Sequence, residues 1–187
     1  MEADWAVEIG SSLARIDADW AGRVDLRERP AALAAIAEAA DYPALEDALL
    51  LLNSAASPVF TSKCDVWLLT PEEIDPLEFE ADSETSVIGV ACYIDVLAGE
   101  AERFASFERH AAWVREAALQ LREIPVANGR CDVVVRAATW EGREGFGLTV
   151  YAAGCGADTQ DAETAWGAIL QAAVTVTMRL ATGPMGE

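Results

Sequence analysis

Basic residues are scarce in this sequence, and their scarcity excludes two kinds of partner. The 187 residues include 13 Lys and Arg, of which only Lys63 is a lysine, against 32 Asp and Glu, so the formal net charge is −19. Such a chain is not expected to bind nucleic acid or an anionic membrane through a general basic surface. The acid excess favours solubility, and it also suits salt adaptation or a basic or aggregation-prone partner protein.

Long apolar runs and a secretory leader are missing as well. The longest apolar runs, 31–37 and 87–94, are far too short to span a bilayer. Residues 1–4 show neither a positive charge nor the start of an apolar stretch, so no signal peptide is predicted. Four cysteines without such a signal indicate buried free thiols in a reducing compartment, and we predict a cytoplasmic protein.

Motifs for metal or cofactor chemistry are nearly absent. The cysteines, none of which forms a C-x-x-C pair, are Cys64, Cys92, Cys131 and Cys155. With His110 as the only histidine, neither a zinc site nor any other metal or cofactor is predicted. The glycines beside Cys155 do not make a G-x-G-x-x-G fingerprint, and the lysine of a P-loop is lacking.

Hydrophobic periodicity predicts both helices and strands. Trp5, Ile9, Leu13, Ile16 and Trp20 recur every three or four residues, which is typical of one helical face. The predicted helices are 5–20, 31–40, 43–56, 100–123 and 159–181, and the predicted strands are 59–70, 87–97, 130–140 and 146–153. The acidic segment 71–84 is left as either a half-exposed edge strand or a long loop.

The second half of the chain resembles two copies of one strand–strand–helix unit. The matching pairs are 63–66 with 130–133, 89–93 with 147–151, and 112–113 with 165–166. The repeated Cys-Asp has two interpretations. It marks a symmetric site at the centre of a sheet, or cysteine packs in the core while aspartate faces water on the same strand.

These elements predict an α+β fold. We expect an antiparallel sheet of four to five strands built from two ββα units, with helices on one face and N-terminal helices added. The expected organisation is an N-terminal helical segment at 1–57, the duplicated domain at 58–182 and a tail at 183–187, together one globular unit.

The element order allows two comparisons. The order ββαββα is a circular permutation of the ferredoxin-like order. With the acidic strand and one preceding helix, the order is similar to the type III secretion chaperone-like architecture. Members of that architecture are small, acidic and often dimeric, so the resemblance implies a homodimeric binding protein. Element order and charge carry the resemblance, and a shared fold does not establish function.

Two sets of residues are candidates for a site. Reactive or pocket groups are Cys155, His110, Tyr93, Tyr151 and Arg136. A candidate interaction surface consists of Trp5, Trp20, Trp67, Trp140, Glu78 and Glu80. Cys155 follows a strand and precedes a helix, where a thiol is activated, or it fills a tight turn as an inert residue. Aromatic residues dominate binding hot spots, so tryptophans on an uncovered sheet face indicate an interaction surface.

The leading hypothesis is a non-enzymatic, chaperone-like protein-binding module that works as a homodimer. The alternative is a small-molecule sensor or small enzyme with a pocket between sheet and helices. A third possibility is a structural subunit of a larger assembly. The pocket version requires that His110 and Cys155 lie close together.

Overall fold

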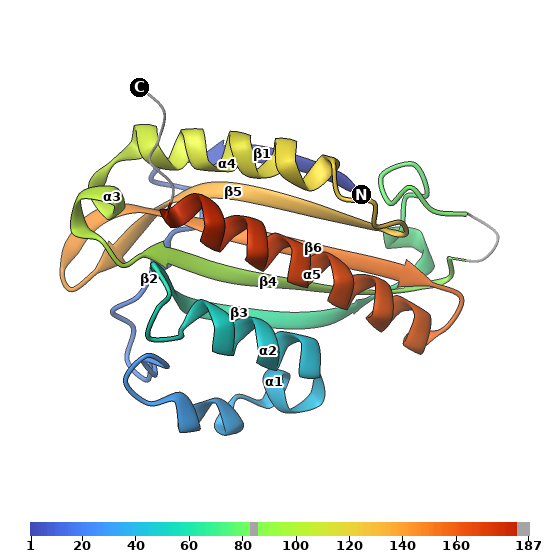
Figure 1. Cartoon of the computed structure of the whole chain (residues 1–187), viewed down its shortest axis with the longest axis horizontal. Helices are drawn as coiled ribbons and strands as arrows, with labels where there is room; N and C mark the ends of the chain where they lie inside the picture. Colours follow the sequence, from blue (N-terminus) through green and yellow to red (C-terminus); the bar gives the residue numbers. More distant parts are fainter. Residues whose placement is uncertain (83–85, 183–187) are drawn as a thin grey trace.

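A computed structural model describes residues 1–82 and 86–182, and it has an α+β fold with a mixed sheet (Figure 1). The six strands are β1 (Glu2–Glu8), β2 (Ile16–Asp17), β3 (Val59–Leu69), β4 (Ile88–Ala98), β5 (Gly129–Trp140) and β6 (Arg143–Gly156). The helices are η1 (Pro30–Ala35), α1 (Ala37–Asp41), α2 (Pro43–Leu52), η2 (Pro71–Glu73), α3 (Ala101–Ala105), α4 (Phe107–Arg122) and α5 (Thr159–Thr182). Helices α2, α4 and α5 cover one face of the sheet.

The predicted helix at the start of the chain is wrong. Its first part is strand β1, which pairs in parallel with β5 from Glu2 opposite Arg130 to Glu8 opposite Arg136. Residues 16–17 form β2, which also runs parallel to β5. The 3–4 spacing of apolar residues gave way to strand pairing, because a short isolated helix is marginal in water, whereas pairing with the edge of β5 places Ala3 in the main core.

The sheet is mixed rather than antiparallel throughout. Its order is β1-β5-β6-β4-β3, and β2 pairs with β5 beside β1. Within the group β5, β6, β4 and β3, adjacent strands pair antiparallel. The two N-terminal strands, β1 and β2, are parallel to β5. The expected antiparallel sheet thus describes its central part only.

Most other predicted elements are found near their expected bounds. The predicted helix 100–123 is interrupted at Ser106, whose hydroxyl accepts a hydrogen bond from the backbone N–H of Arg109 and so begins α4. The acidic segment contains η2 and turns in its described residues 71–82, so there it is not an edge strand. Residues 83–84, the end of that predicted segment, lie outside the described residues.

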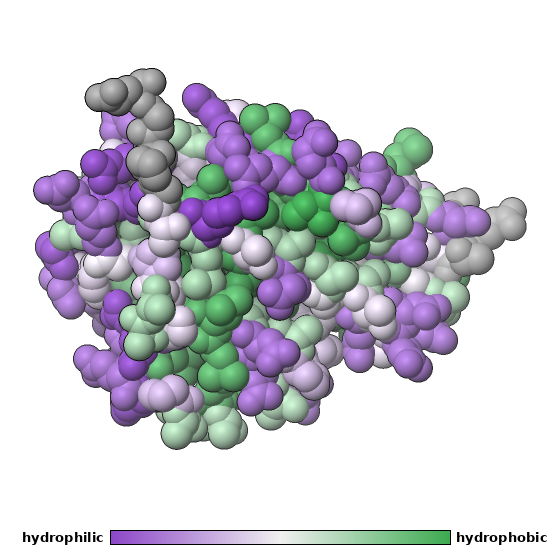
Figure 2. All heavy atoms as spheres, viewed as in Figure 1, coloured by the Kyte–Doolittle hydropathy of each residue, from purple (hydrophilic) through white to green (hydrophobic). Residues whose placement is uncertain are grey.

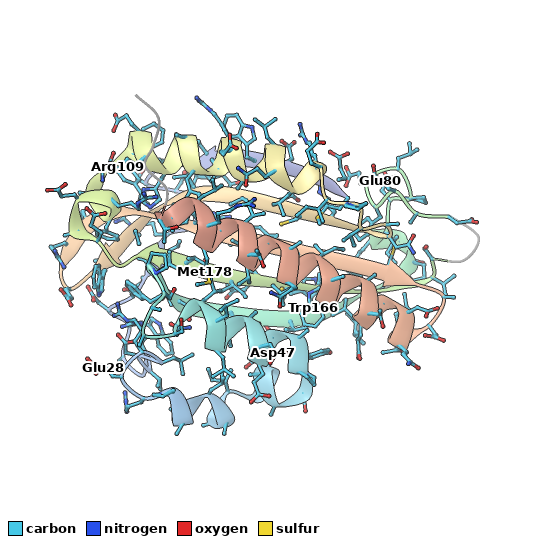
Figure 3. The ribbon with its side chains drawn as sticks, in the orientation of Figure 1. Glu28, Asp47, Glu80, Arg109, Trp166 and Met178 are labelled. Carbon is cyan, nitrogen blue, oxygen red and sulfur yellow. The ribbon has the colours of Figure 1, made fainter. Side chains whose placement is uncertain are left out.

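The main core lies between the sheet and the three helices. Trp113 of α4 and Trp166 of α5 are fully buried there, together with Cys92 and Cys131 on the sheet. Trp166 is labelled on α5 in Figure 3. Residues of β1 and α2 also belong to this core, so the N-terminal part of the chain packs with the rest. On the same side of the molecule, apolar side chains also reach the surface over α2 and the end of α5 (Figure 2).

Within residues 1–82 and 86–182, the opposite face of the sheet is covered only at its two ends. At one end Ile16 and Ala18 pack on Phe60, Phe104 and Trp140 to form a second core. At the other end the acidic segment folds back, and its Ile74 and Phe79 cover Cys155. Between these two covers lies a band of polar and aromatic side chains, which we call the central strip.

Candidate functional site

The central strip is a set of side chains that point away from the helices on neighbouring strands. Strand alternation puts them there, because a residue directly before or after nearly all of them belongs to the main core or packs against it. Its members are Asp4 and Glu8 on β1, Asp132 and Arg136 on β5, Thr149 and Tyr151 on β6, Tyr93 and Asp95 on β4, and Asp65 and Trp67 on β3. One register row across the sheet reads Asp4, Asp132, Tyr151, Tyr93, Asp65.

A hydrogen-bonded network holds the middle of the strip. The Thr149 hydroxyl donates to Asp95 Oδ1 at 2.6 Å and accepts from Arg136 Nε at 3.1 Å. Arg136 also donates from Nη2 to the Tyr151 hydroxyl at 3.1 Å, and its Nη1 lies 2.8 Å from a carboxylate oxygen of Glu8. The guanidinium is therefore held in one orientation by partners on the two neighbouring strands, β1 and β6.

Three aromatic rings form a ladder across β3, β4 and β6. The ring centroids of Trp67 and Tyr93 are 6.5 Å apart, and those of Tyr93 and Tyr151 are 6.2 Å apart. Trp67 is 38% exposed, and both tyrosines are partly exposed. A continuous, partly exposed aromatic surface on a sheet offers large contact area at little cost in side-chain entropy.

Asp95 is the most unusual ionisable group of the strip. The residue is only 7% exposed, and burial raises the pKa of its carboxyl to about 6 against the opposing effects of Thr149, Arg136 and Lys63. Burial, followed by the charges of Asp95 and Asp65, raises the pKa of Tyr93. Buried groups with perturbed pKa values gather at functional sites, although ion-pair networks also produce them.

A surface cavity of about 310 Å³ adjoins the strip at β1, β5 and β6. Asp4, Asp132, Arg136 and Tyr151 line it. The Oδ1 atom of Asp132 is buried there and has no hydrogen-bond partner among the described residues, while Oδ2 accepts from Arg130 Nε at 2.7 Å. Asp132 therefore carries one buried acceptor that no described residue satisfies. No group of three His, Cys, Asp or Glu in residues 1–82 and 86–182 is arranged to hold a metal ion.

The structure brings together three of the five predicted pocket residues. Tyr93, Tyr151 and Arg136 meet in the central strip. His110 and Cys155 lie in different places: His110 contacts Trp113 and Phe146 beside α4, whereas Cys155 is in the cluster covered by the acidic segment. The geometry gives no support to a nucleophile–base pair formed by these two residues.

The four thiols are free and mostly buried. Burial raises the pKa of Cys64 to about 12 and that of Cys92 to about 11, and it also raises the pKa of Cys131 and of Cys155. A thiol that resists deprotonation is a poor nucleophile, so the environment of Cys155 favours an inert residue. The tight turn predicted there is wrong, because Cys155 lies in β6 and pairs with Gly89 of β4.

His110 is buried and neutral, and we expect it to make the fold sensitive to acid. Its Nδ1 lies 2.8 Å from the Ser106 carbonyl, which can only accept, so Nδ1 carries the proton; Nε2 is buried without a partner among the described residues. Burial lowers the pKa of His110. Its contribution to stability is therefore complete above pH 6.5 and is lost as the pH falls below that value, by no more than about 1.4 kcal/mol per pH unit.

Urea unfolding at pH 7.5 and pH 5.5 checks this expectation for His110. Wild type is expected to lose more stability between these pH values than His110→Gln, whose side chain does not titrate. Equal losses in the two proteins would mean that His110 is protonated without cost in the folded state.

The predicted interaction surface divides among three environments. Trp67 lies exposed in the central strip, whereas Trp140 is 8% exposed and packs between Phe60 and Phe104, so Trp140 does not contribute to a surface. Partly exposed Trp5 and Trp20 lie under cations: the Arg115 guanidinium is 4.9 Å from the Trp5 ring centroid, and the Lys63 ammonium is 5.6 Å from that of Trp20. Glu78 pairs with Arg130, and Glu80 lies 3.4 Å from the Met1 amino group.

Sequence reasoning missed Asp95 and Thr149. A signal for Asp95 was present, because it is the only charged residue within the otherwise apolar strand 87–97. A charge is rarely placed in a central strand unless it is paired or has a function. Thr149 had no comparable signal, since threonine is common in strands and its role depends on the neighbouring strands.

The molecule was compared with known proteins, and no family model, curated protein or solved structure matches this chain. In residues 1–82 and 86–182, none of the helices combines the length and the apolar character needed to cross a membrane.

Proposed function

We propose that the protein is a non-enzymatic, cytoplasmic binding module that holds a partner protein against the central strip. The observation that carries the proposal is the aromatic ladder of Trp67, Tyr93 and Tyr151, left partly exposed on a sheet face that is covered at both ends. Partly exposed aromatic side chains on a rigid sheet are the typical anchors of protein interfaces.

A proposed internal repeat of the fold adds support. We interpret β3, β4 and α3–α4 as one ββα unit and β5, β6 and α5 as the other, related by a pseudo-twofold axis between β4 and β6. The register supports this reading, because Tyr93 pairs directly with Tyr151, its counterpart in the repeat, and Asp65 and Asp132 flank them on the outer strands. The strip then offers two similar half-sites to one partner segment.

The alternative of an internal pocket has less support. The space detected between the sheet and helices α2 and α5, lined by Leu52, Ile94 and Val174 among others, is about 10 Å³, which is too small for a ligand. The predicted homodimer stays a prediction.

Capture of partners from host lysate tests the proposed function if it is done with matched variants. Trp67→Gln is expected to reduce the amount of the main captured protein by about tenfold, because it removes an anchor aromatic. Leu119→Gln is the control, since Leu119 is 57% exposed on α4 and faces away from the strip. If Trp67→Gln leaves the amount of the captured protein unchanged and Leu119→Gln abolishes its capture, the interface lies on the helices and the proposal is refuted.

A further inference from the structure

The central strip has a surplus of negative charge that its own cations do not neutralise. Arg136 is paired with Glu8, and Arg130 is paired with Asp132 and Glu78. Asp65 and Asp95 have no ion pair within 4.0 Å among the described residues, and Asp65 accepts only the backbone N–H of Val66. The uncompensated carboxylates therefore lie on β3 and β4.

Asp95 is under-satisfied for a buried carboxylate. Within residues 1–82 and 86–182, the Thr149 hydroxyl is its only hydrogen-bond donor, and that bond uses Oδ1 alone. The nearby cation Lys63 lies over the Trp20 ring and forms no ion pair with Asp95. A carboxylate at this depth ordinarily has several donors, so Oδ2 is available for one that the chain does not supply.

The aromatic ladder lies beside these two carboxylates. Asp65 is opposite Tyr93 in the register, and the charges of both Asp65 and Asp95 act on the Tyr93 hydroxyl. Trp67 lies two residues along β3 and contacts the same ring. Aromatic faces bordered by carboxylates are the arrangement that binds a guanidinium or ammonium group, because the ring face and the acid both attract a cation.

The dimensions of the strip suit an extended chain. It crosses five strands about 4.8 Å apart, which is roughly 20 Å and corresponds to about six residues of extended peptide. Toward β1, the carboxylates of Asp4 and Asp132 line the surface cavity beside Tyr151 and extend the acidic character of the strip. Charge complementarity therefore selects a basic segment among the possible occupants of this face.

From these observations we infer that the central strip binds an extended, arginine-rich segment of a partner protein, with one cationic side chain seated on Tyr93 and Trp67 between Asp65 and Asp95. This inference rests on the proposed function and names the chemistry of its partner. Asp65 and Asp95 contribute the charge, and Trp67 and Tyr93 contribute the ring faces.

Calorimetric titration with the synthetic peptide acetyl-(Arg-Ser)₄-amide at about 0.15 M salt tests the inference. The double variant Asp65→Asn/Asp95→Asn is expected to weaken the association constant of this peptide by about tenfold or more, because charge-assisted hydrogen bonds are lost. The matched control is Asp41→Asn/Asp47→Asn, which removes the same charge from exposed positions on α1 and α2. Its expected effect is less than about twofold, since exposed distant charges are screened.

Several outcomes would overturn the inference. Equal weakening in both double variants would show attraction to net charge alone, and equal binding of acetyl-(Gln-Ser)₄-amide would show that no cation is recognised. Spermine binding as tightly as the peptide, with the same dependence on Asp65 and Asp95, would make a small polyamine the ligand. If no probe binds while capture of a partner still depends on Trp67, this inference fails and the proposed function stands. If the peptide binds but Trp67→Gln captures the same proteins as wild type, the proposed function fails instead.

Discussion

Gly154→Ala is expected to destabilise the protein by about 3 kcal/mol or more, because helix α5 lies directly against the backbone of β6 at this position. A Cβ added to Gly154 would lie 2.2 Å from the backbone N of Trp166 and 2.6 Å from its Cα. Backbone atoms cannot rotate away as a side chain can, so α5 must move off the sheet. Trp166 and Ile169, fully buried on α5, would lose packing with it.

Chemical denaturation measures this loss, and Gly10→Ala is the matched control. A Cβ at Gly10 meets only the Leu13 side chain at 3.5 Å, which is ordinary contact. That variant is expected to change the free energy of unfolding by less than about 1 kcal/mol. If the two variants prove equally stable, α5 is not packed on Gly154 in solution.

Asp95→Asn is expected to stabilise the protein at pH 7 by up to about 3 kcal/mol. The pKa of Asp95 rises from its usual 3.8 to about 6 on folding, so the folded state prefers the protonated acid. Stability from this group is present below pH 3.8 and is lost as the pH rises from 3.8 to 6, and a rise of this size corresponds to about 3 kcal/mol. Asparagine keeps the acceptor for Thr149 without the buried charge.

Unfolding free energies from pH 4 to pH 7 check the effect of this substitution. Wild type is expected to lose the Asp95 contribution over that range, and Asp95→Asn is expected to lack it. Asp65→Asn, which neutralises an exposed carboxyl of the same strip, is expected to stay within about 0.5 kcal/mol of wild type. A wild-type protein as stable as Asp95→Asn at pH 7, with the same pH dependence, would show that Asp95 is solvated or paired.

The two Asp95 predictions together test a trade between stability and binding. Asp95→Asn is expected to raise stability, and the double variant Asp65→Asn/Asp95→Asn, which contains it, is expected to weaken binding of the arginine peptide. Such opposed effects are common where a site holds an unfavourable charge for its ligand. A variant that gains stability and retains full peptide binding would leave Asp95 outside the site.

Much of the central sheet could be predicted from local pattern. The runs 59–70, 87–97 and 130–140 are rich in β-branched and aromatic residues, and each is a strand close to its expected bounds. The long amphipathic pattern of 159–181 likewise became α5. Local pattern also placed Tyr93 and Tyr151 in strands, but it did not show that they pair.

The first segment shows where local pattern is insufficient. Residues 5–20 satisfy a helical spacing, yet 2–8 also alternate, with Ala3, Trp5 and Val7 toward the helices and the acidic Asp4 and Glu8 on the other face. Which periodicity prevails depends on whether another strand edge is available. The register with β5 supplies that edge, and it lies more than a hundred residues away in the sequence.

The sequence by itself determined the class of the fold and the strands that carry Tyr93, Tyr151 and Arg136, because strand alternation and helical periodicity are local properties. It assigned Asp65 and Asp132 to one face of their strands and the cysteines beside them to the other. Only the tertiary structure decided that this face is covered at its two ends, that Trp140 is buried and that Asp95, Thr149 and Arg136 form one network. Those outcomes depend on long-range strand register and on distant segments that fold over the sheet. Neither of these can be recognised in the local sequence pattern.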